Sequence, residues 1–176
     1  MFVRKADIWP MQSLTYRQAT IHDAPAMQTL GLLAYGAFYP ELEPEHKETM
    51  DTNLRKVELY PNLLSQATGF VCCESDTLAG MAFLVPNGNP TAIYPAEWSY
   101  IRMVGVNPGY QNRGIARKLT QMCIDHARAI GEHTISLHTS EMMNAARHIY
   151  ESLGFAIERK IPPIFGKRYW LYKLAL

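Results

Sequence analysis

The sequence predicts an α+β fold, a mixed and mostly antiparallel sheet of six to seven strands with helices on both of its faces. Two observations predict it. Segments of strand length, alternating between apolar and polar residues or apolar throughout, recur along the chain, and several follow one another across short turns. Between them lie segments with the apolar period of an amphipathic helix, two of which end at a glycine.

Length and composition indicate one domain. The chain has 176 residues, 48% apolar and 19% charged, which is enough for a hydrophobic core. The first residues show no period, so we expect an N-terminal extension at residues 1–13 and a single domain at residues 14–176.

The domain begins with a strand and a helix. Residues 14–19 alternate and predict the strand. Thr20, with Asp23 three residues later, is typical of a helix start. The helix that follows presents an apolar stripe: Met27, Leu30, Leu33 and Ala34.

Residues 35–62 are polar, contain three prolines and are expected to be irregular. They carry an acidic set: Glu41, Glu43, Glu45, Glu48 and Asp51. Such a set is usually a solvated loop face, but it could also draw a cationic amine into a cleft. Both interpretations stay open.

The middle of the chain predicts three strands. Residues 69–74 and 80–85 are apolar and are separated by a short turn, which favours a strand pair. A loop with two prolines, residues 86–90, then leads to a long strand at residues 98–106.

The segment after this long strand has the features of an anion site. A Pro-Gly turn leads into Gln-Asn-Arg-Gly-Ile-Ala, and apolar residues then recur at helical spacing. The N–H groups at a helix start lack intrahelical partners and, with the helix dipole, attract phosphate oxygens. Gly114 permits a backbone conformation that other residues disfavour, and Ala116 keeps the first turn slim. Neither a nucleotide P-loop nor a dinucleotide fingerprint matches this spacing.

A second strand and helix follow further along the chain. Residues 135–139 alternate, and the next helix has one apolar face: Met142, Ala146, Ile149 and Leu153. Gly154 ends this helix and Phe155 begins a new strand.

The C-terminal part predicts two last strands. They cover residues 155–161 and 169–174. We expect a break between them at Pro162-Pro163, because proline cannot donate to a strand ladder.

The anion-site segment resembles a motif of the GNAT superfamily of acyl-CoA-dependent N-acyltransferases. Gln111, Gly114 and Ala116 follow the Gln-x-x-Gly-x-Ala order of its pyrophosphate-binding turn, after a Val-x-Val-x-Pro strand. The specificity of this short pattern comes from the preceding strand and from a second match downstream.

The second match lies in the later helix. Asn144, Tyr150 and Gly154-Phe155 are similar to the family's Asn-x-x-Ala-x-x-x-Tyr-x-x-x-Gly-Phe region, with Arg147 in place of the small residue. Two motifs in the correct order make coincidence improbable. The resemblance is strongest over residues 98–155.

The resemblance implies an acetyltransferase that uses no metal. Acetyl-CoA would donate its acetyl group to a primary amine by direct attack in a ternary complex, at a sheet that is splayed in the middle. The residues implied in cofactor binding are Met103, Val104, Val106, Gln111, Asn112, Arg113, Gly114, Ile115, Ala116, Arg117, Asn144 and Tyr150.

The resemblance also implies catalytic roles. The N–H of Val104, freed where the strands splay, is a candidate oxyanion donor, although an ordinary buried strand is compatible with the same residues. Tyr150 is the candidate general acid for the departing thiolate, with core packing as the alternative. Asn144 would bond the pantetheine arm or satisfy the helix start.

The general base is the least defined role. The family often uses a strand carboxylate, and Glu97, at the start of the long strand, is the candidate here. A solvated charge at the strand end is the alternative. His138 and His148 also titrate near neutral pH, although a lone histidine is more often structural.

The acceptor is expected to be a small amine that enters between residues 35–62 and residues 86–95. These segments are rich in aromatic rings, which attract cations: Tyr35, Phe38, Tyr39, Tyr60 and Tyr94. The rings could equally anchor two long loops to the core. A non-catalytic acyl-CoA-binding sensor or structural domain and a protein N-terminal or lysine acetyltransferase stay open as alternatives.

Charge and cysteine content exclude other classes. A net charge of +1 gives no case for nucleic acid or an anionic membrane surface. Cys72, Cys73 and Cys123 have no metal-binding spacing and favour a reducing compartment, the cytoplasm. No apolar run reaches transmembrane length. Whether exposed strands pair into a homodimer stays open.

Overall fold

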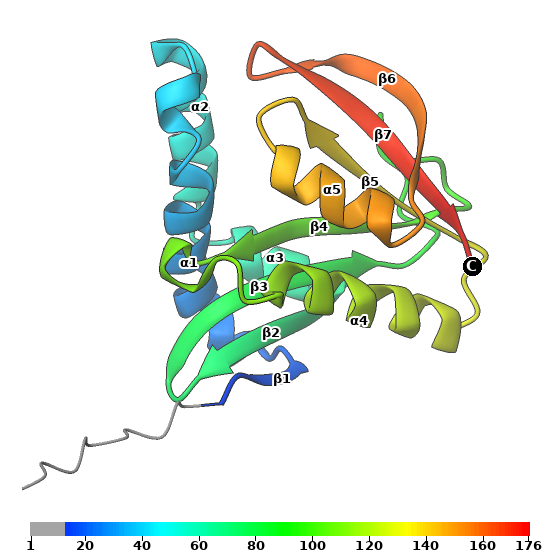
Figure 1. Ribbon diagram of the computed structural model, residues 1–176, viewed down its shortest axis with the longest axis horizontal. Helices are drawn as coiled ribbons and strands as arrows, with labels where there is room; N and C mark the ends of the chain where they lie inside the picture. Colours follow the sequence, from blue (N-terminus) through cyan, green and yellow to red (C-terminus); the bar gives the residue numbers. More distant parts are fainter. Residues whose placement is uncertain (1–12) are drawn as a thin grey trace, which may run out of the picture.

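A computed structural model describes residues 13–176 of the chain (Figure 1). The predicted extension, residues 1–13, therefore lies outside the described residues except for Ser13. One sheet runs through the described part in the order β1-β2-β3-β4-β5-β7-β6, and only β4 and β5 pair in parallel. The strands are β1 (Thr15–Gln18), β2 (Thr68–Glu74), β3 (Thr77–Val85), β4 (Ser99–Val106), β5 (Thr134–Ser140), β6 (Ala156–Ile164) and β7 (Lys167–Ala175). The predicted mixed, mostly antiparallel sheet is confirmed.

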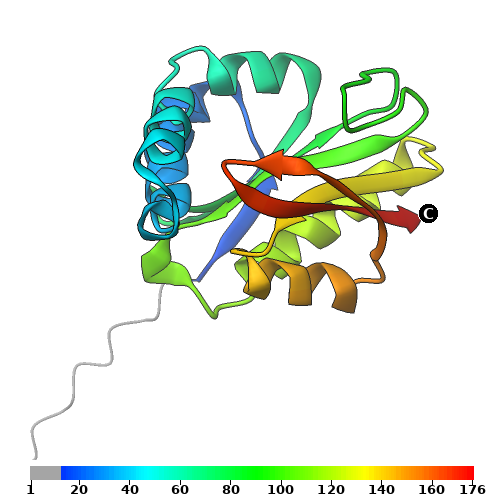
Figure 2. The ribbon, with the colours of Figure 1, turned by 90° about the horizontal axis from the view of Figure 1, so that it is seen from above.

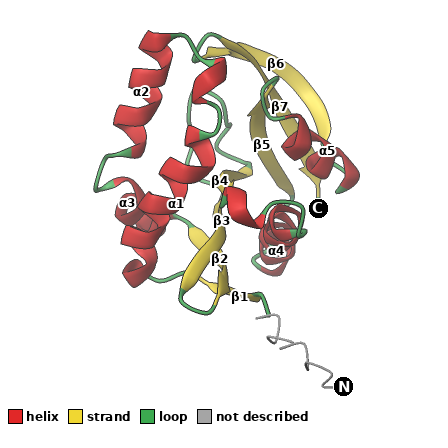
Figure 3. Cartoon of the chain, turned by 60° about the vertical axis from the view of Figure 1, so that its left-hand side comes forward, coloured by secondary structure: helices red, strands yellow, loops and turns green. Residues whose placement is uncertain are grey.

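Helices cover both faces of this sheet, as predicted (Figure 3). Within the described residues they are α1 (Ala24–Gly36), α2 (Pro44–Leu54), α3 (Leu59–Gln66), α4 (Ile115–Ala129) and α5 (Asn144–Ser152). Short 3-10 turns lie at η1 (Ile21–Asp23), η2 (Tyr39–Glu41) and η3 (Pro108–Tyr110). Helices α1–α3 lie on one side of the sheet, and α4 and α5 lie on the other (Figures 2 and 3). None of the helices between residues 13 and 176 is long and apolar enough to cross a membrane.

The expectation of an irregular segment at residues 35–62 is wrong, because α2 and the first half of α3 lie there. Its prolines do not prevent helices. Pro44 is the first residue of α2, and Pro61 lies in the first turn of α3, where a missing N–H costs no helical hydrogen bond. Helix α2 buries only Met50 and Leu54, so its apolar period is too sparse to read from the sequence.

The predicted break at Pro162-Pro163 is also wrong. Both prolines lie inside β6, where the pairing with β7 shifts register between Ile161 and Ile164. Strand β6 is at the edge of the sheet. An edge strand tolerates proline because its outer N–H groups have no ladder partner to lose.

Two apolar cores fill the space between the helices and the sheet. The core beneath α4 and α5 includes Leu119, Cys123, Ile135, Leu137 and Tyr172. The core beneath α1 and α3 includes Met27, Leu30, Tyr60, Met81 and Phe83. Strands β3 and β4 lie between these cores and contribute side chains to both.

The central strands separate at one point. Strand β4 pairs with β5 only through Ser99–Ile135 and Tyr100–Ser136, and beyond Tyr100 the two strands diverge (Figure 1). The splayed sheet is therefore confirmed. On its other side β4 bulges, because two residues, Met103 and Val104, stand between register pairs that enclose a single residue of β3. Met103 has a positive φ of 53°, which is uncommon for a residue with a side chain.

Candidate functional site

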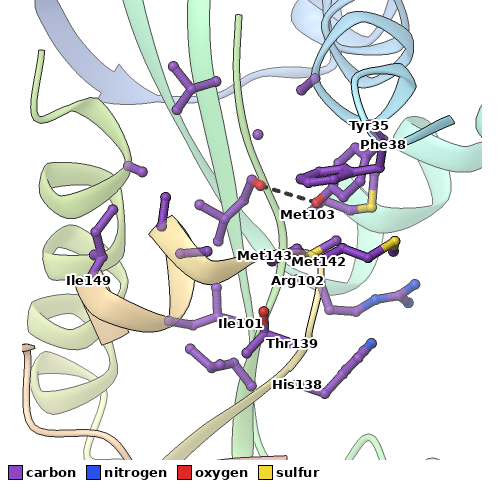
Figure 4. Close-up of a pocket in the computed structure, with 18 of the residues that line it drawn as sticks. Tyr35, Phe38, Ile101, Arg102, Met103, His138, Thr139, Met142, Met143 and Ile149 are labelled. Carbon is purple, nitrogen blue, oxygen red and sulfur yellow. Dashed lines mark hydrogen bonds between the residues drawn. The ribbon is translucent and has the colours of Figure 1, made fainter. Parts of the chain in front are cut away.

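A cavity of about 720 Å³ lies where β4 and β5 diverge (Figure 4). Its walls come from α1, α2, the diverging strands, and the N-terminal ends of α4 and α5, with the β6–β7 turn at one side. This volume is within the range of sites for small molecules and cofactors.

The N-terminus of α4 forms one end of the cavity. Gly114 has a φ of 75°, and a Cβ placed there would meet no atom within 4 Å. The first intrahelical bond runs from the N–H of Lys118 to the oxygen of Gly114 at 3.0 Å, so the three preceding amides have no helical partner. These amides belong to Ile115, Ala116 and Arg117, and all three residues line the cavity with Gln111, Asn112 and Gly114. The arrangement suits an anion.

Arg113 is the one predicted cofactor residue that does not line the cavity. Its guanidinium donates a hydrogen bond of 2.8 Å to Glu74 and lies over the ring of Tyr110. Arg113 therefore connects the turn before α4 to β2. Arg117 does line the cavity and also donates to the hydroxyl of Ser152, which ties α4 to α5.

The bulge of β4 forms the middle of the cavity. Met103, Val104 and Val106 all line it. The hydroxyl of Tyr35 donates a hydrogen bond of 3.2 Å to the main-chain oxygen of Val104, and this bond connects α1 to the bulge (Figure 4). Burial raises the pKa of Tyr35, so the phenol stays a donor at any physiological pH.

Tyr150 and Asn144 lie on the α5 side of the cavity. Tyr150 is buried, with 6% of its surface exposed, and packs edge-on against Phe155. Burial strongly raises the pKa of its phenol, which therefore keeps its proton. Asn144 is exposed at the first residue of α5. Both side chains line the cavity, and the roles assigned to them stay predictions.

The candidate base, Glu97, is not brought to the cavity. It is exposed in the turn before β4 and is absent from the lining. His148 is likewise exposed on α5 and outside the lining. The acidic set does not line the cavity either, and Asp51 is engaged by Tyr39 and Arg55. Among residues 13–176, no aspartate or glutamate lines the cavity.

A contact that the sequence does not reveal lies at the opposite end from α4. The ring nitrogen Nδ1 of His138 is 2.5 Å from the hydroxyl of Tyr94, which stacks on Tyr100. Burial, together with the nearby cation of Arg102, lowers the pKa of His138 to about 4. No sequence signal links His138 to Tyr94, because they are 44 residues apart and meet only through the sheet and the loop after β3.

Comparison with known proteins identifies similar sequences. The model of the acetyltransferase (GNAT) family matches residues 32–155. The L-amino acid N-acyltransferase MnaT of Escherichia coli K12 is 31% identical over 112 residues, 56% of this chain and 64% of that protein. The L-methionine sulfoximine/L-methionine sulfone acetyltransferase of Salmonella typhimurium LT2 is 34% identical over 115 residues, 64% of this chain and 60% of that protein. The chain thus spans slightly less than two thirds of these curated relatives.

Solved structures share the fold. The paiA N-acetyltransferase of Thermoplasma acidophilum, in complex with coenzyme A, has a TM-score of 0.73 at 15% identity and covers 92% of this chain and 99% of that chain. The yncA protein of Salmonella typhimurium, solved with its cofactor acetyl-CoA, has a TM-score of 0.66 at 22% identity and covers 92% and 93%. At these identities the likeness concerns the fold alone.

Proposed function

The chain belongs to the acetyltransferase (GNAT) family, and we propose that it moves the acetyl group of acetyl-CoA to the primary amine of a small molecule. The transfer is a direct attack of the amine on the thioester in a ternary complex. The domain that carries it out is residues 14–176.

One observation carries this proposal. A single cavity joins the unpartnered amides at the start of α4 to the bulge of β4 and to the buried phenol of Tyr150. In the proposed complex the amides of residues 115–117, with Gln111 and Asn112, bind the pyrophosphate of acetyl-CoA. The pantetheine arm lies along Met103, Val104 and Val106 and contacts Asn144.

The chemistry then takes place at the bulge. The amine nitrogen attacks the carbonyl carbon of the thioester, a C–N bond forms, and negative charge develops on the oxygen. The N–H of Val104 is the proposed donor to that oxygen. The C–S bond breaks, and the sulfur takes the proton of the Tyr150 hydroxyl, which regains one from solvent.

The amine must also lose a proton. We propose that His138, and not Glu97, is the general base that accepts it. Within the described residues, His138 is the only histidine that lines the cavity, and no carboxylate does. The lowered pKa of His138 keeps its imidazole unprotonated and able to accept a proton. The hydroxyl of Tyr94 fixes the orientation of the ring.

The shape of the cavity favours a small acceptor over a polypeptide. Phe165, in the β6–β7 turn, packs with the cluster of Met50 and Leu54 from α2. At the next residue, a Cβ on Gly166 would lie 2.9 Å from the ring of His46. The β6–β7 turn and α2 therefore touch across the acceptor end. Both curated relatives described above are also named for amino acids or amino acid analogues.

Thiol release from acetyl-CoA with a panel of small amines tests the proposed function. We expect release that requires both substrates, with an acceptor that gains the mass of one acetyl group. A protein that binds acetyl-CoA and releases no thiol above background is a sensor. Acetylation of added peptides but of no small amine indicates a protein-modifying enzyme.

A further inference from the structure

The acceptor end of the cavity is positively charged. The lining of the whole cavity contains three cations, Lys56, Arg102 and Arg117, and, within residues 13–176, no carboxylate. Arg117 belongs to the α4 end and is bonded to Ser152. The side chains of Lys56 and Arg102 form no ion pair or hydrogen bond with other described residues. Two charged groups in the wall of one cavity thus have no partner among residues 13–176.

Arg102 lies away from the proposed pyrophosphate site. It precedes Val106 by four residues on β4, a separation of roughly 13 Å along a strand. Its side chain is exposed and extends away from α5, on the same side as His138 (Figure 4). The cation of Arg102 contributes to the lowered pKa of His138, so the two groups are within electrostatic range. Arg102 therefore faces the position of the acceptor.

The remaining wall at this end is apolar and rich in methionine. Met50, Leu54 and Met142 form a buried cluster. Partly buried side chains packed on it include Met103, Met143, Tyr35, Phe38 and Phe165. Methionine side chains are flexible and polarizable, so they adapt to an apolar group of irregular shape.

We propose that Arg102 forms a carboxylate subsite in the wall of the cavity, and that the acceptor is an amino acid with an apolar side chain. This inference rests on the proposed function and names the acceptor class for the same site. The three parts of such an acceptor match three features of the cavity. The amine reaches the bulge, the carboxylate pairs with the guanidinium, and the apolar side chain lies among the methionines. A guanidinium binds a carboxylate through two parallel hydrogen bonds, which also orients the amine.

The subsite has a consequence for His138. The Arg102 cation is one of the two causes that lower the pKa of this imidazole. A bound carboxylate neutralises that cation and makes His138 a stronger base when the acceptor is in place. The carboxylate would thus serve both recognition and proton transfer.

Two acceptors that differ only in the carboxylate test the proposal: L-methionine and 3-(methylthio)propylamine. We expect Arg102→Gln to lower kcat/KM for L-methionine by roughly 10- to 100-fold, mainly through KM, as for loss of a charged hydrogen bond. For the amine without a carboxylate we expect no such loss, because it has no carboxylate to pair with Arg102 and removal of this cation raises the pKa of His138. Comparing variant with parent for each acceptor cancels the difference between the two amine pKa values. The kcat/KM of Arg102→Lys for L-methionine should lie between those of the parent and of Arg102→Gln. Lysine keeps the positive charge but cannot form the two parallel hydrogen bonds of a guanidinium.

The control is Arg128→Gln, which removes one positive charge from an exposed position on α4 outside the cavity. This variant should keep the parent kcat/KM for both acceptors. If Arg102→Gln lowers kcat/KM equally for both acceptors, Arg102 is not a carboxylate subsite.

A binding measurement separates this proposal from the proposed function. Calorimetry with N-acetyl-L-methionine in the presence of coenzyme A requires no turnover. Binding that needs both the carboxylate and Arg102 supports the subsite even if no amine is acetylated. Equal binding by the parent and by Arg102→Gln overturns it even if acetyl transfer occurs.

Discussion

The hydroxyl of Tyr35 and the main-chain oxygen of Val104 are joined by a hydrogen bond of 3.2 Å, which anchors the bulge of β4 to α1. Tyr35→Phe removes this bond and leaves the oxygen without its partner. We expect a loss of about 1–2 kcal/mol in the free energy of unfolding, measured by urea denaturation. We also expect kcat to fall, because the bulge carries the proposed oxyanion donor.

Tyr39→Phe is the matched control for Tyr35. It removes a tyrosine hydroxyl that bonds to Asp51, outside the cavity. It should change kcat little. If Tyr35→Phe also keeps the parent kcat, the bulge does not depend on α1.

Gly114 provides a test of the cofactor site. Gly114→Ala and Gly131→Ala both place a side chain on a residue with positive φ, 75° and 84°, where no atom lies within 4 Å. Both should cost about 1–2 kcal/mol in stability through backbone strain. Only Gly114 lines the cavity, so only Gly114→Ala should weaken acetyl-CoA binding, by about tenfold or more as measured by calorimetry. Gly114→Val should weaken it further. If both Gly114 variants bind acetyl-CoA with the parent affinity, the cofactor does not bind at the turn before α4.

Tyr150 provides a test of the general acid. Tyr150→Phe removes one hydroxyl from a buried ring, so folding and acetyl-CoA affinity should survive. Turnover should fall by roughly 10²–10⁴, the range for loss of a general acid. Tyr172→Phe is the control, because its hydroxyl bonds to Arg147 and Glu151 of α5 and does not line the cavity. A turnover number unchanged in Tyr150→Phe would leave the phenol with a packing role.

The lowered pKa of His138 predicts how stability depends on pH. The folded protein holds this imidazole neutral down to about pH 4, whereas the unfolded chain protonates it near its ordinary pKa of about 6.5. Its contribution to stability is therefore present above about pH 6.5 and is lost as the pH falls toward 4. The loss should reach at most about 3 kcal/mol.

Urea denaturation at pH 7.5 and at pH 4.5 measures this loss. His138→Gln cannot gain the proton, so it should lose less stability than the parent over the same interval. Equal losses in the two proteins would mean that His138 is solvated and titrates normally in the folded state.

The sequence was most informative where local pattern and local chemistry coincide. The turn from Gln111 to Ala116 and the glycine at 114 define a helix start that needs no distant partner to be recognised. The strands before and after this segment, β4 and β5, could likewise be recognised from their own residues. Most predicted cofactor residues therefore line one cavity in the structure, and Arg113 does not because Glu74, distant in the sequence, binds it.

The acceptor end could not be read in the same way. Its residues come from α1, α2, β4, β5 and the β6–β7 turn, and only the folded sheet brings them together. Arg102 looks like any exposed strand residue in the sequence, and the glutamates of residues 41–48 stand out although they face solvent. Of the two interpretations of the acidic set, the solvated loop face agrees with the structure, whereas the wall of the cavity contains cations and, within the described residues, no carboxylate.

Initial rates over a grid of acetyl-CoA and acceptor concentrations test whether one cavity holds donor and acceptor together. With the acceptor found in the amine panel, we expect double-reciprocal lines that intersect. We also expect mass spectrometry of the protein with acetyl-CoA alone to show no acetyl-enzyme. Parallel lines together with an acetylated protein would contradict direct attack in a ternary complex.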